Sequence, residues 1–204
     1  MTDRAMTRST HPVTPDRFED FADIVNPSRR VRACWCVSPR LRAEDVRELG
    51  GGDRETAMRA LCARTPPGVV TYRDGEPVGW CNLGPRADIP RLAASRLIRP
   101  VDDVPVWSIV CLIVRSGHRR QGVTARLIDG AVAWARSEGA PAVEAYPVDT
   151  PRGEDAPRMD NARLFVGTRS MFERAGFAVI GITEAEANGL PRLVMRRTLD
   201  PGSA

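Results

Sequence analysis

The chain has 204 residues, and its 30 Lys and Arg against 26 Asp and Glu leave a net charge of +4. This length fits one domain with a buried core, and so small a positive excess gives no reason to expect a nucleic-acid or membrane partner. The five cysteines are odd in number and include no second pair at zinc spacing, so we expect reduced thiols and no metal site. No apolar run reaches the roughly 18 residues of a membrane span, and the first residues lack a signal-peptide pattern, which predicts a soluble, cytoplasmic protein.

The first part of the chain is polar, and residues 1–28 carry three prolines. Its apolar residues have the spacing of one helical face, namely Phe18, Phe21, Ile24 and Val25. We therefore expect a flexible, loosely docked N-terminal arm over residues 1–28, followed by a single domain over residues 29–200.

The next segments predict a strand, a helix, a hairpin and a long loop. The short apolar run at 31–37 is typical of a first strand. Residues 54–64 have an apolar face at helical spacing between a triple glycine and a double proline, which predicts a helix. Two apolar segments, 69–72 and 78–83, flank an Asp-Gly pair and should form an antiparallel hairpin. Residues 84–105 carry four prolines without a period, which indicates a surface loop.

The second half of the chain predicts a strand-helix-strand unit. Residues 106–114 are almost continuously apolar, which indicates a central strand covered on both faces. An amphipathic helix is expected over 121–138 with Gly139 at its exit, and a strand parallel to the first over 142–148, joined by a right-handed crossover. A loop, a short helix closed by Gly176 and two final strands should follow, at 147–161, 167–175, 177–182 and 193–197. The fold class is therefore mixed α/β.

A basic segment with two glycines, SGHRRQGVT at 116–124, lies between the central strand and the long helix. The start of a helix offers backbone N–H groups without intrahelical partners and a dipole that favours negative charge, so the segment indicates an anion site. The alternative is a solvated basic turn. A nucleotide-binding P-loop is disfavoured because Val123 stands where the phosphate-contacting lysine belongs, and the G-x-G-x-x-G of dinucleotide sites is absent.

The segment from 106 to 148 resembles the acetyl-coenzyme A-binding core of the GNAT superfamily of N-acetyltransferases. The family signature is Arg/Gln-x-x-Gly-x-Gly/Ala, which Arg119 to Val123 match and from which Thr124 departs in the last place. The element order from residue 31 onward and the sequence MFERAGF at 171–177 are also similar to the family. The resemblance implies a mostly antiparallel, GNAT-type central sheet with a parallel β-α-β core for acetyl-CoA and helices on both faces.

The resemblance also implies how acetyl-CoA, the expected co-substrate, is held. The signature would bind the pyrophosphate through backbone N–H groups, and the edge of the central strand would pair with the pantetheine amides. A backbone N–H near Leu112 would polarise the thioester carbonyl, beside a strand that splays away. The implied cofactor residues are Leu112, Ile113, Val114, Arg119, Arg120, Gln121, Gly122, Val123 and Thr124.

The catalytic groups that the family often uses are replaced in this chain. Ser108 stands where the central strand often carries a glutamate base, and Phe172 stands where the late helix often carries a tyrosine acid. Glu144 and Tyr146 are candidate substitutes because their separation of two places them on one face of a strand. The alternatives are a salt-bridged carboxylate for Glu144 and core packing for Tyr146. Ser170 is a further candidate for a hydrogen bond to the departing sulfur, or an ordinary serine on a helix surface.

The expected reaction is direct transfer of acetyl from acetyl-CoA to an amine, because a buried Cys111 in an apolar strand is a poor nucleophile. The acceptor would be a small-molecule amine or a protein or peptide amino group, and a homodimer remains an open alternative to a monomer. The rival hypothesis is a GNAT-like protein that binds acyl-CoA as a sensor or regulatory subunit without turnover, since the family's glutamate and tyrosine are missing.

Overall fold

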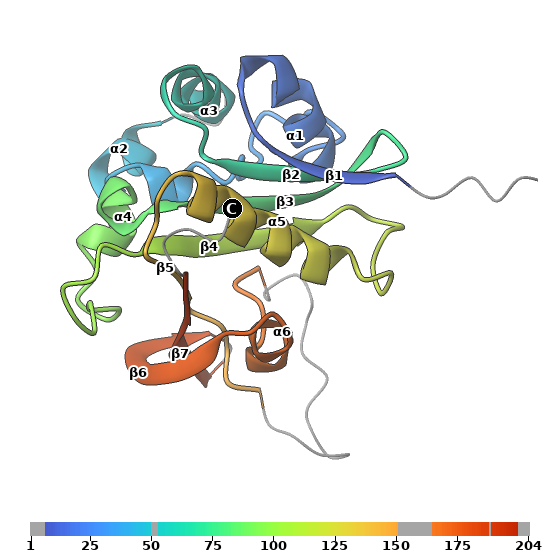
Figure 1. Cartoon of the computed structure of the whole chain (residues 1–204). Helices are drawn as coiled ribbons and strands as arrows, with labels where there is room; N and C mark the ends of the chain where they lie inside the picture. Colours follow the sequence, from blue (N-terminus) through green and yellow to red (C-terminus); the bar gives the residue numbers. More distant parts are fainter. Residues whose placement is uncertain (1–6, 50–52, 151–164, 188, 200–204) are drawn as a thin grey trace, which may run out of the picture.

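The computed structural model describes residues 7–49, 53–150, 165–187 and 189–199. Within them, the chain forms one seven-stranded sheet with the order β1-β2-β3-β4-β5-β7-β6 (Figure 1). Neighbouring strands are antiparallel except β4 and β5, which are parallel. The predicted mixed α/β fold is therefore confirmed. The strands are β1 Arg8–Pro12, β2 Gly68–Arg73, β3 Glu76–Pro85, β4 Trp107–Val114, β5 Ala142–Ala145, β6 Ala178–Ala187 and β7 Leu190–Thr198.

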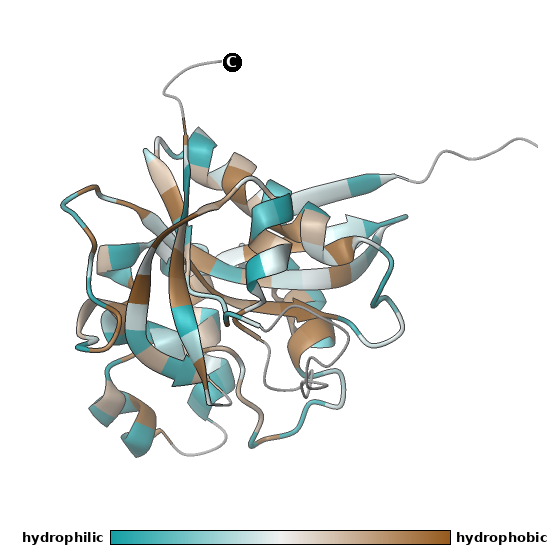
Figure 2. Ribbon diagram, turned by 90° about the horizontal axis from the view of Figure 1, so that it is seen from below, coloured by the Kyte–Doolittle hydropathy of each residue, from teal (hydrophilic) through white to brown (hydrophobic). Residues whose placement is uncertain are grey.

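Helices cover both faces of this sheet. One core joins α5 and α6 to the strands through residues such as Leu127 and Phe172, and a second lies under α1 and α3 around Phe21 and Met58. Figure 2 shows apolar residues along the central strands, between the helices. None of the helices in the described residues is both long and apolar enough to cross a bilayer. The helices are α1 Phe18–Val25, α2 Ala43–Glu48, α3 Asp53–Arg64, α4 Pro90–Ala93, α5 Val123–Ser137 and α6 Arg169–Arg174, with 3-10 turns at Pro15–Arg17, Ser38–Arg40 and Arg86–Asp88.

The strand-helix-strand unit and the hairpin are confirmed. β2 and β3 pair antiparallel around Asp74 and Gly75, both with positive φ, as a two-residue hairpin turn requires. α5 follows β4 and returns the chain to β5, parallel to β4. The short helix α6 and the pair β6 and β7 also lie where the pattern predicts them. The part of the expected loop that falls at 151–161 lies outside the described residues.

The expected loose arm at 1–28 is wrong for the part of it that the structure describes. Residues 8–12 form β1, which pairs with β2 as an edge strand of the sheet. The predicted helical face exists as α1, but it belongs to the core: Phe21 is fully buried, and its ring centroid lies 4.7 Å from that of Trp80. Because these aromatic side chains supply much of the apolar surface under α1 and α3, the segment is part of the domain.

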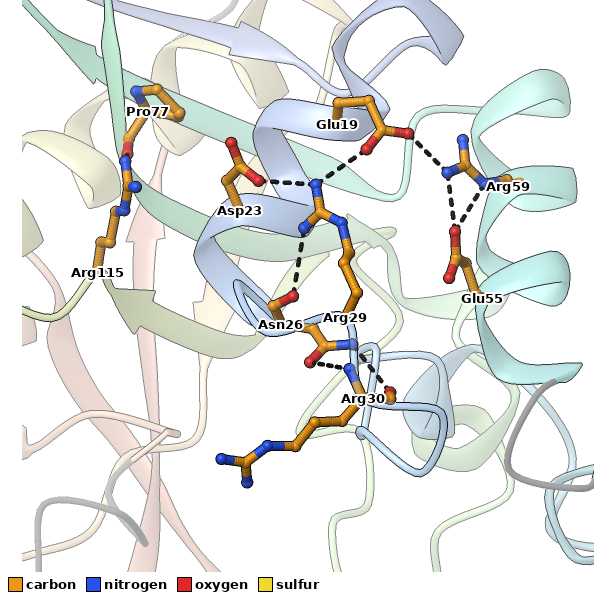
Figure 3. A network of polar contacts seen from close by, with 9 residues as sticks. All are labelled: Glu19, Asp23, Asn26, Arg29, Arg30, Glu55, Arg59, Pro77 and Arg115. Carbon is orange, nitrogen blue, oxygen red and sulfur yellow. Dashed lines mark hydrogen bonds and ion pairs between the residues drawn. The ribbon is translucent and has the colours of Figure 1, made fainter.

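Ion pairs add to the docking of α1 against α3 (Figure 3). Glu19 on α1 pairs with Arg59 of α3 at 2.6 Å and with Arg29 at 2.9 Å, and Arg29 also pairs with Asp23 at 2.7 Å. The guanidinium of Arg59 also lies 3.8 Å from the centroid of the Phe18 ring. Exposed pairs of this kind contribute little individually, so apolar burial stabilises α1 and the pairs fix its orientation.

The strand expected at 31–37 is not formed. The segment consists of turns, and Trp35 and Cys36 have φ of +53° and +51°, in the left-handed region. Trp35, Cys36 and Val37 are buried all the same, and the Trp35 ring stacks on Phe18 with centroids 5.9 Å apart, whereas Val31 is exposed. The end of the apolar run thus belongs to the core under α1, whereas the position beside β2 in the sheet is taken by β1.

Candidate functional site

The segment between β4 and α5 is a tight loop with three backbone positions in the left-handed region. Gly117 has φ +89°, Arg120 +59° and Gly122 +74°. Turns of this kind can aim successive backbone N–H groups into a concavity that binds anions. Gln121 braces the loop, because its side-chain N–H donates to the Gly117 carbonyl at 2.9 Å and its side-chain carbonyl accepts from Arg73.

The N-terminus of α5 opens directly from this loop and is uncapped. Gly122 is the N-cap residue, and no side chain in the described part of the chain accepts a hydrogen bond from the first turn. The backbone N–H of Arg126 reaches the Gly122 carbonyl, so the three N–H groups at 123–125 have no acceptor within the helix. Free N–H groups at a helix N-terminus, together with the helix dipole, are an arrangement that can bind a phosphate or another anion.

The side chains of the signature divide between core and solvent. Val123 is buried, and a Cβ placed on Gly79 of β3 would meet it at 3.0 Å, so Val123 anchors the helix start on the sheet. Arg119 and Arg120 are exposed, and Thr124 is half-buried. The arginines are therefore placed to add charge-assisted donors to the backbone site.

β4 and β5 diverge in the way that the resemblance implies. They pair only where Trp107 to Ile109 face Val143 to Ala145, although β4 continues to Val114. β4 has a bulge at the end of the paired region. The consecutive β3 residues Asn82 and Leu83 pair with Cys111 and Ile109, so Val110 has no partner residue in β3. A bulge re-aims the backbone of one strand, so Val110 marks the fork between the two strands.

The chain itself enters this fork. The backbone N–H of Leu112 donates to the Phe165 carbonyl at 2.6 Å, and Val148 after β5 donates to the Gly167 carbonyl at 3.2 Å. The predicted donor near Leu112 is thus engaged with the chain's own carbonyl. Ile113 and Val114 continue β4 toward the anion-binding loop, so the predicted cofactor edge and the predicted pyrophosphate loop are contiguous.

Three of the four predicted catalytic residues meet in one buried polar cluster. The Tyr146 hydroxyl donates to Glu144 Oε2 at 2.8 Å and lies 3.0 Å from Ser108 Oγ. Arg86 Nη1 donates to the same hydroxyl at 2.6 Å, and Arg196 donates to Glu144 Oε1 through Nη2 at 2.7 Å and through Nε at 3.0 Å. The separation of two between Glu144 and Tyr146 therefore did place them together, with Ser108 from the neighbouring strand.

The roles open to this cluster follow from its hydrogen bonds. Glu144 is only 2% exposed, and both of its oxygens are taken, by Arg196 and Tyr146. Burial, reinforced by the Glu144 charge, raises the pKa of Tyr146, so its hydroxyl stays protonated at neutral pH. Glu144 thus holds the Tyr146 hydroxyl in place, and that hydroxyl keeps its proton.

The remaining candidates lie apart from the cluster. Ser170 is on α6, where its hydroxyl lies 3.3 Å from that of Thr168. Phe172 is fully buried, so the late helix offers no acid at that position. His118 lies 3.7 Å from Glu76 at the far end of β4, and Cys111 lies 3.8 Å from the Cys36 sulfur, so these two do not form a nucleophile and base pair.

A largely apolar cavity of about 470 Å³ adjoins the fork. Val110, Cys111 and Ile113 of β4 line it, together with residues of α4 and of the turn segment at 34–39. Tyr146 also lines the cavity, so it belongs both to this wall and to the buried polar cluster. This is the volume in which an acceptor would meet a thioester held at the fork.

Sequence reasoning missed Val110 and the arginines around Tyr146. The bulge depends on the register of β3 against β4, which no local pattern reports. Arg86, Arg192 and Arg196 come from outside the strand-helix-strand unit, and many arginines of similar context surround them in the sequence. Within the described residues, no group of three or more His, Cys, Asp or Glu side chains is placed to hold a metal ion.

Comparison with known proteins identifies this combination of sheet, fork and loop. Residues 38–158, more than half of the chain, match the model of the acetyltransferase (GNAT) family. The chain therefore belongs to the GNAT acetyltransferase family. No curated protein matches the chain.

Solved structures agree on the fold. Aminoglycoside acetyltransferase AAC(6')-Ib in complex with coenzyme A superimposes with a TM-score of 0.55 at 13% identity, over 94% of this chain and 95% of that one. YncA from Salmonella typhimurium, a putative acetyltransferase with its cofactor acetyl-CoA, gives 0.52 at 14% identity, over 97% and 96%. An N-acetyltransferase from Staphylococcus aureus Mu50 gives 0.52 at 10% identity, over 95% and 99%. At these identities the likeness is one of fold.

Proposed function

We propose that the protein transfers the acetyl group of acetyl-CoA to a primary amine by direct attack. The observation that carries the proposal is the uncapped N-terminus of α5, which opens from a left-handed loop at the end of β4, next to a forked pair of parallel strands. The family membership and the solved relatives that hold coenzyme A or acetyl-CoA support the same function.

In this proposal the coenzyme lies from the α5 N-terminus to the fork. The backbone N–H groups from Arg119 to Thr124 bind the pyrophosphate, with the two arginine side chains adding charge. The pantetheine amides pair with β4 along Leu112, Ile113 and Val114, which requires that the coenzyme take the place of the Phe165 carbonyl at Leu112. The backbone of Val110, re-aimed by the bulge, is the candidate donor to the thioester carbonyl.

In the acetyl transfer the acceptor nitrogen, an ammonium in solution, loses two protons, and the departing sulfur gains one. The amine nitrogen attacks the thioester carbon, the C–N bond forms, and the C–S bond breaks to release the coenzyme A thiolate. The acceptor ammonium first loses one proton to water, and its nitrogen loses a second as the tetrahedral adduct becomes the neutral amide. The thiolate takes the hydroxyl proton of Tyr146, which Glu144, Ser108 and Arg86 hold in place, and the second nitrogen proton restores that hydroxyl. The net products are the amide, the coenzyme A thiol and one proton in water. Ser170 on α6 is a secondary candidate for a hydrogen bond to the sulfur.

The deciding experiment is turnover. Purified protein, acetyl-CoA and a panel of primary amines, with a lysine-containing peptide among them, are incubated, and free coenzyme A and acetylated product are separated by chromatography. Chromatography is preferred to a thiol reagent because the protein carries five free cysteines of its own. Amine-dependent formation of both products supports the proposal, and acetylation of the peptide alone would make the acceptor a protein or peptide amino group. Tight binding of acetyl-CoA without turnover on any amine would favour the acyl-CoA sensor instead.

A further inference from the structure

The cavity beside the fork has an apolar wall without acidic groups. Ile89, Leu92 and Ile98, from α4 and its flanking residues, line it together with Val110 and Ile113 of β4. Among the described residues that line the cavity, none is Asp or Glu. A wall of this composition favours a ligand with an apolar body, since burying apolar surface stabilises by about 25 cal/mol per Å². Its volume of about 470 Å³ is in the range of small-molecule sites.

Arg192 brings a positive charge to this apolar wall. It is half-buried on β7, where its Nε donates to the Tyr146 carbonyl at 2.8 Å. Burial lowers the pKa of Arg192, and within the described residues no carboxylate pairs with its guanidinium. A partly buried charge without a counter-ion is unfavourable, so an anionic group on a ligand would be stabilised there by charge-assisted hydrogen bonds. Arg91, on the exposed side of α4, adds a second positive charge to the cavity.

We infer that the acceptor is a primary amine with an apolar body and a carboxylate, as in a hydrophobic amino acid, and that Arg192 binds the carboxylate. This inference rests on the proposed acetyl transfer at the same site. The apolar body contacts lining residues such as Ile98 and Val110, and the amino group faces the fork, where the thioester would be presented. A polycationic acceptor is disfavoured because it would meet two arginines and no acidic side chain among the described lining residues.

Two acceptors that differ only in the carboxylate test the inference. L-Phenylalanine and L-phenylalanine amide share one apolar body, and kanamycin represents a polycation. We expect kcat/KM for coenzyme A formation to be at least tenfold higher with the acid than with the amide, and lowest with kanamycin. An amide as good as the acid, or kanamycin as the best acceptor, overturns the inference.

Binding of the acetylated products gives a readout that does not depend on turnover or on the titration of the amine. N-acetyl-L-phenylalanine should bind at least tenfold more tightly than its amide by calorimetry. If no amine is acetylated, the proposed function fails while this comparison still decides the inference. If amines are acetylated but both products bind equally, the inference fails alone.

A variant pair assigns the effect to one residue. Arg192→Gln should reduce the preference for the acid over the amide to less than twofold and leave acetyl-CoA affinity unchanged. Arg99→Gln removes the same charge from an exposed position that is not among the lining residues, so the preference should persist. An Arg192→Gln protein that keeps the preference contradicts the assignment, and if this variant does not fold, the wild-type product comparison remains decisive.

Discussion

Replacing Tyr146 by Phe removes one hydroxyl from the point where three side chains meet. That hydroxyl accepts from Arg86 at 2.6 Å, lies 3.0 Å from the Ser108 hydroxyl and donates to Glu144 at 2.8 Å. The ring would remain, fully buried, so the cavity wall keeps its shape. Tyr146→Phe therefore tests the polar cluster without opening a void.

The expected loss of stability follows from those three hydrogen bonds. A hydrogen bond to a charged group contributes about 1.5 to 3 kcal/mol and a neutral one about 1 kcal/mol, so simple addition gives about 4 to 7 kcal/mol. Addition overestimates here, because Arg86 keeps its bond to the Ile98 carbonyl and Glu144 keeps Arg196. We expect the free energy of unfolding to fall by about 2 to 4 kcal/mol, which lowers Tm by about 4 to 16 °C in a chain of this size.

Two measurements on this variant separate structure from catalysis. Denaturant unfolding gives the stability change, with Ser108→Ala as a matched control that removes one neutral partner and costs about 1 kcal/mol. Steady-state kinetics should show a kcat that falls at least a hundredfold while KM for acetyl-CoA changes little, because the proton donor is lost and the binding residues are intact. A stability change below about 0.5 kcal/mol would refute the cluster as a structural unit. Unchanged kcat would refute Tyr146 as the donor.

Three further predictions concern the loop, the N-terminal helix and the Arg196 ion pairs. At Gly122 a Cβ meets no protein atom within 4 Å but φ is +74°, so the Ala variant bears only backbone strain, whereas the Asp variant adds repulsion of the pyrophosphate by a carboxylate. Calorimetry should show acetyl-CoA affinity about 100-fold lower for Gly122→Asp than for Gly122→Ala. Phe21→Ala should lower the free energy of unfolding by about 3 to 5 kcal/mol in denaturant titration; a loss below 1 kcal/mol would restore the picture of a loose arm. The hydrogen bonds from Arg196 lower the pKa of Asp102 below its usual 3.8, so Asp102 stabilises the fold above that pH and loses the effect as the pH falls through its folded pKa. Asp102→Asn should therefore be less stable than wild type at pH 7 and equal to it at the acid end. A pH-independent difference in stability would contradict the ion pair.

Sequence periodicity predicted the parts of the fold whose signals are local. β4 is a short run apolar on both faces, α5 has an apolar stripe, and the turn at Asp74 and Gly75 has the residues that its backbone demands. The segment at 116–124 was correctly predicted to lie between the central strand and the long helix, because its position after a buried strand was readable from the same pattern. These elements could be predicted without knowing which other segments pack against them.

The errors came from segments whose structure depends on distant partners. The run at 31–37 is as apolar as a strand, yet it becomes turns because Trp35 finds its place beneath α1 and β1 takes the sheet edge. The polar N-terminal segment forms the strand β1, whose pairing partner, β2, lies some sixty residues away in sequence. In the site, the alternation of side chains along a strand predicted that Glu144 and Tyr146 lie together. It could not predict that an arginine hydrogen-bonds to Glu144, since Arg196 comes from β7. Tertiary register, rather than local propensity, decided each of these.

Binding of acetyl-CoA at the α5 N-terminus is the central claim, and thermal unfolding with and without ligand tests it most directly. At about 100 times its dissociation constant, acetyl-CoA should stabilise the protein by about 2.7 kcal/mol, a Tm increase of about 5 to 11 °C. ATP at the same concentration should give a markedly smaller increase, and the Gly122→Asp protein should show almost none with either ligand. No increase with acetyl-CoA, or an equal increase with ATP, would contradict the assignment of this loop to coenzyme A.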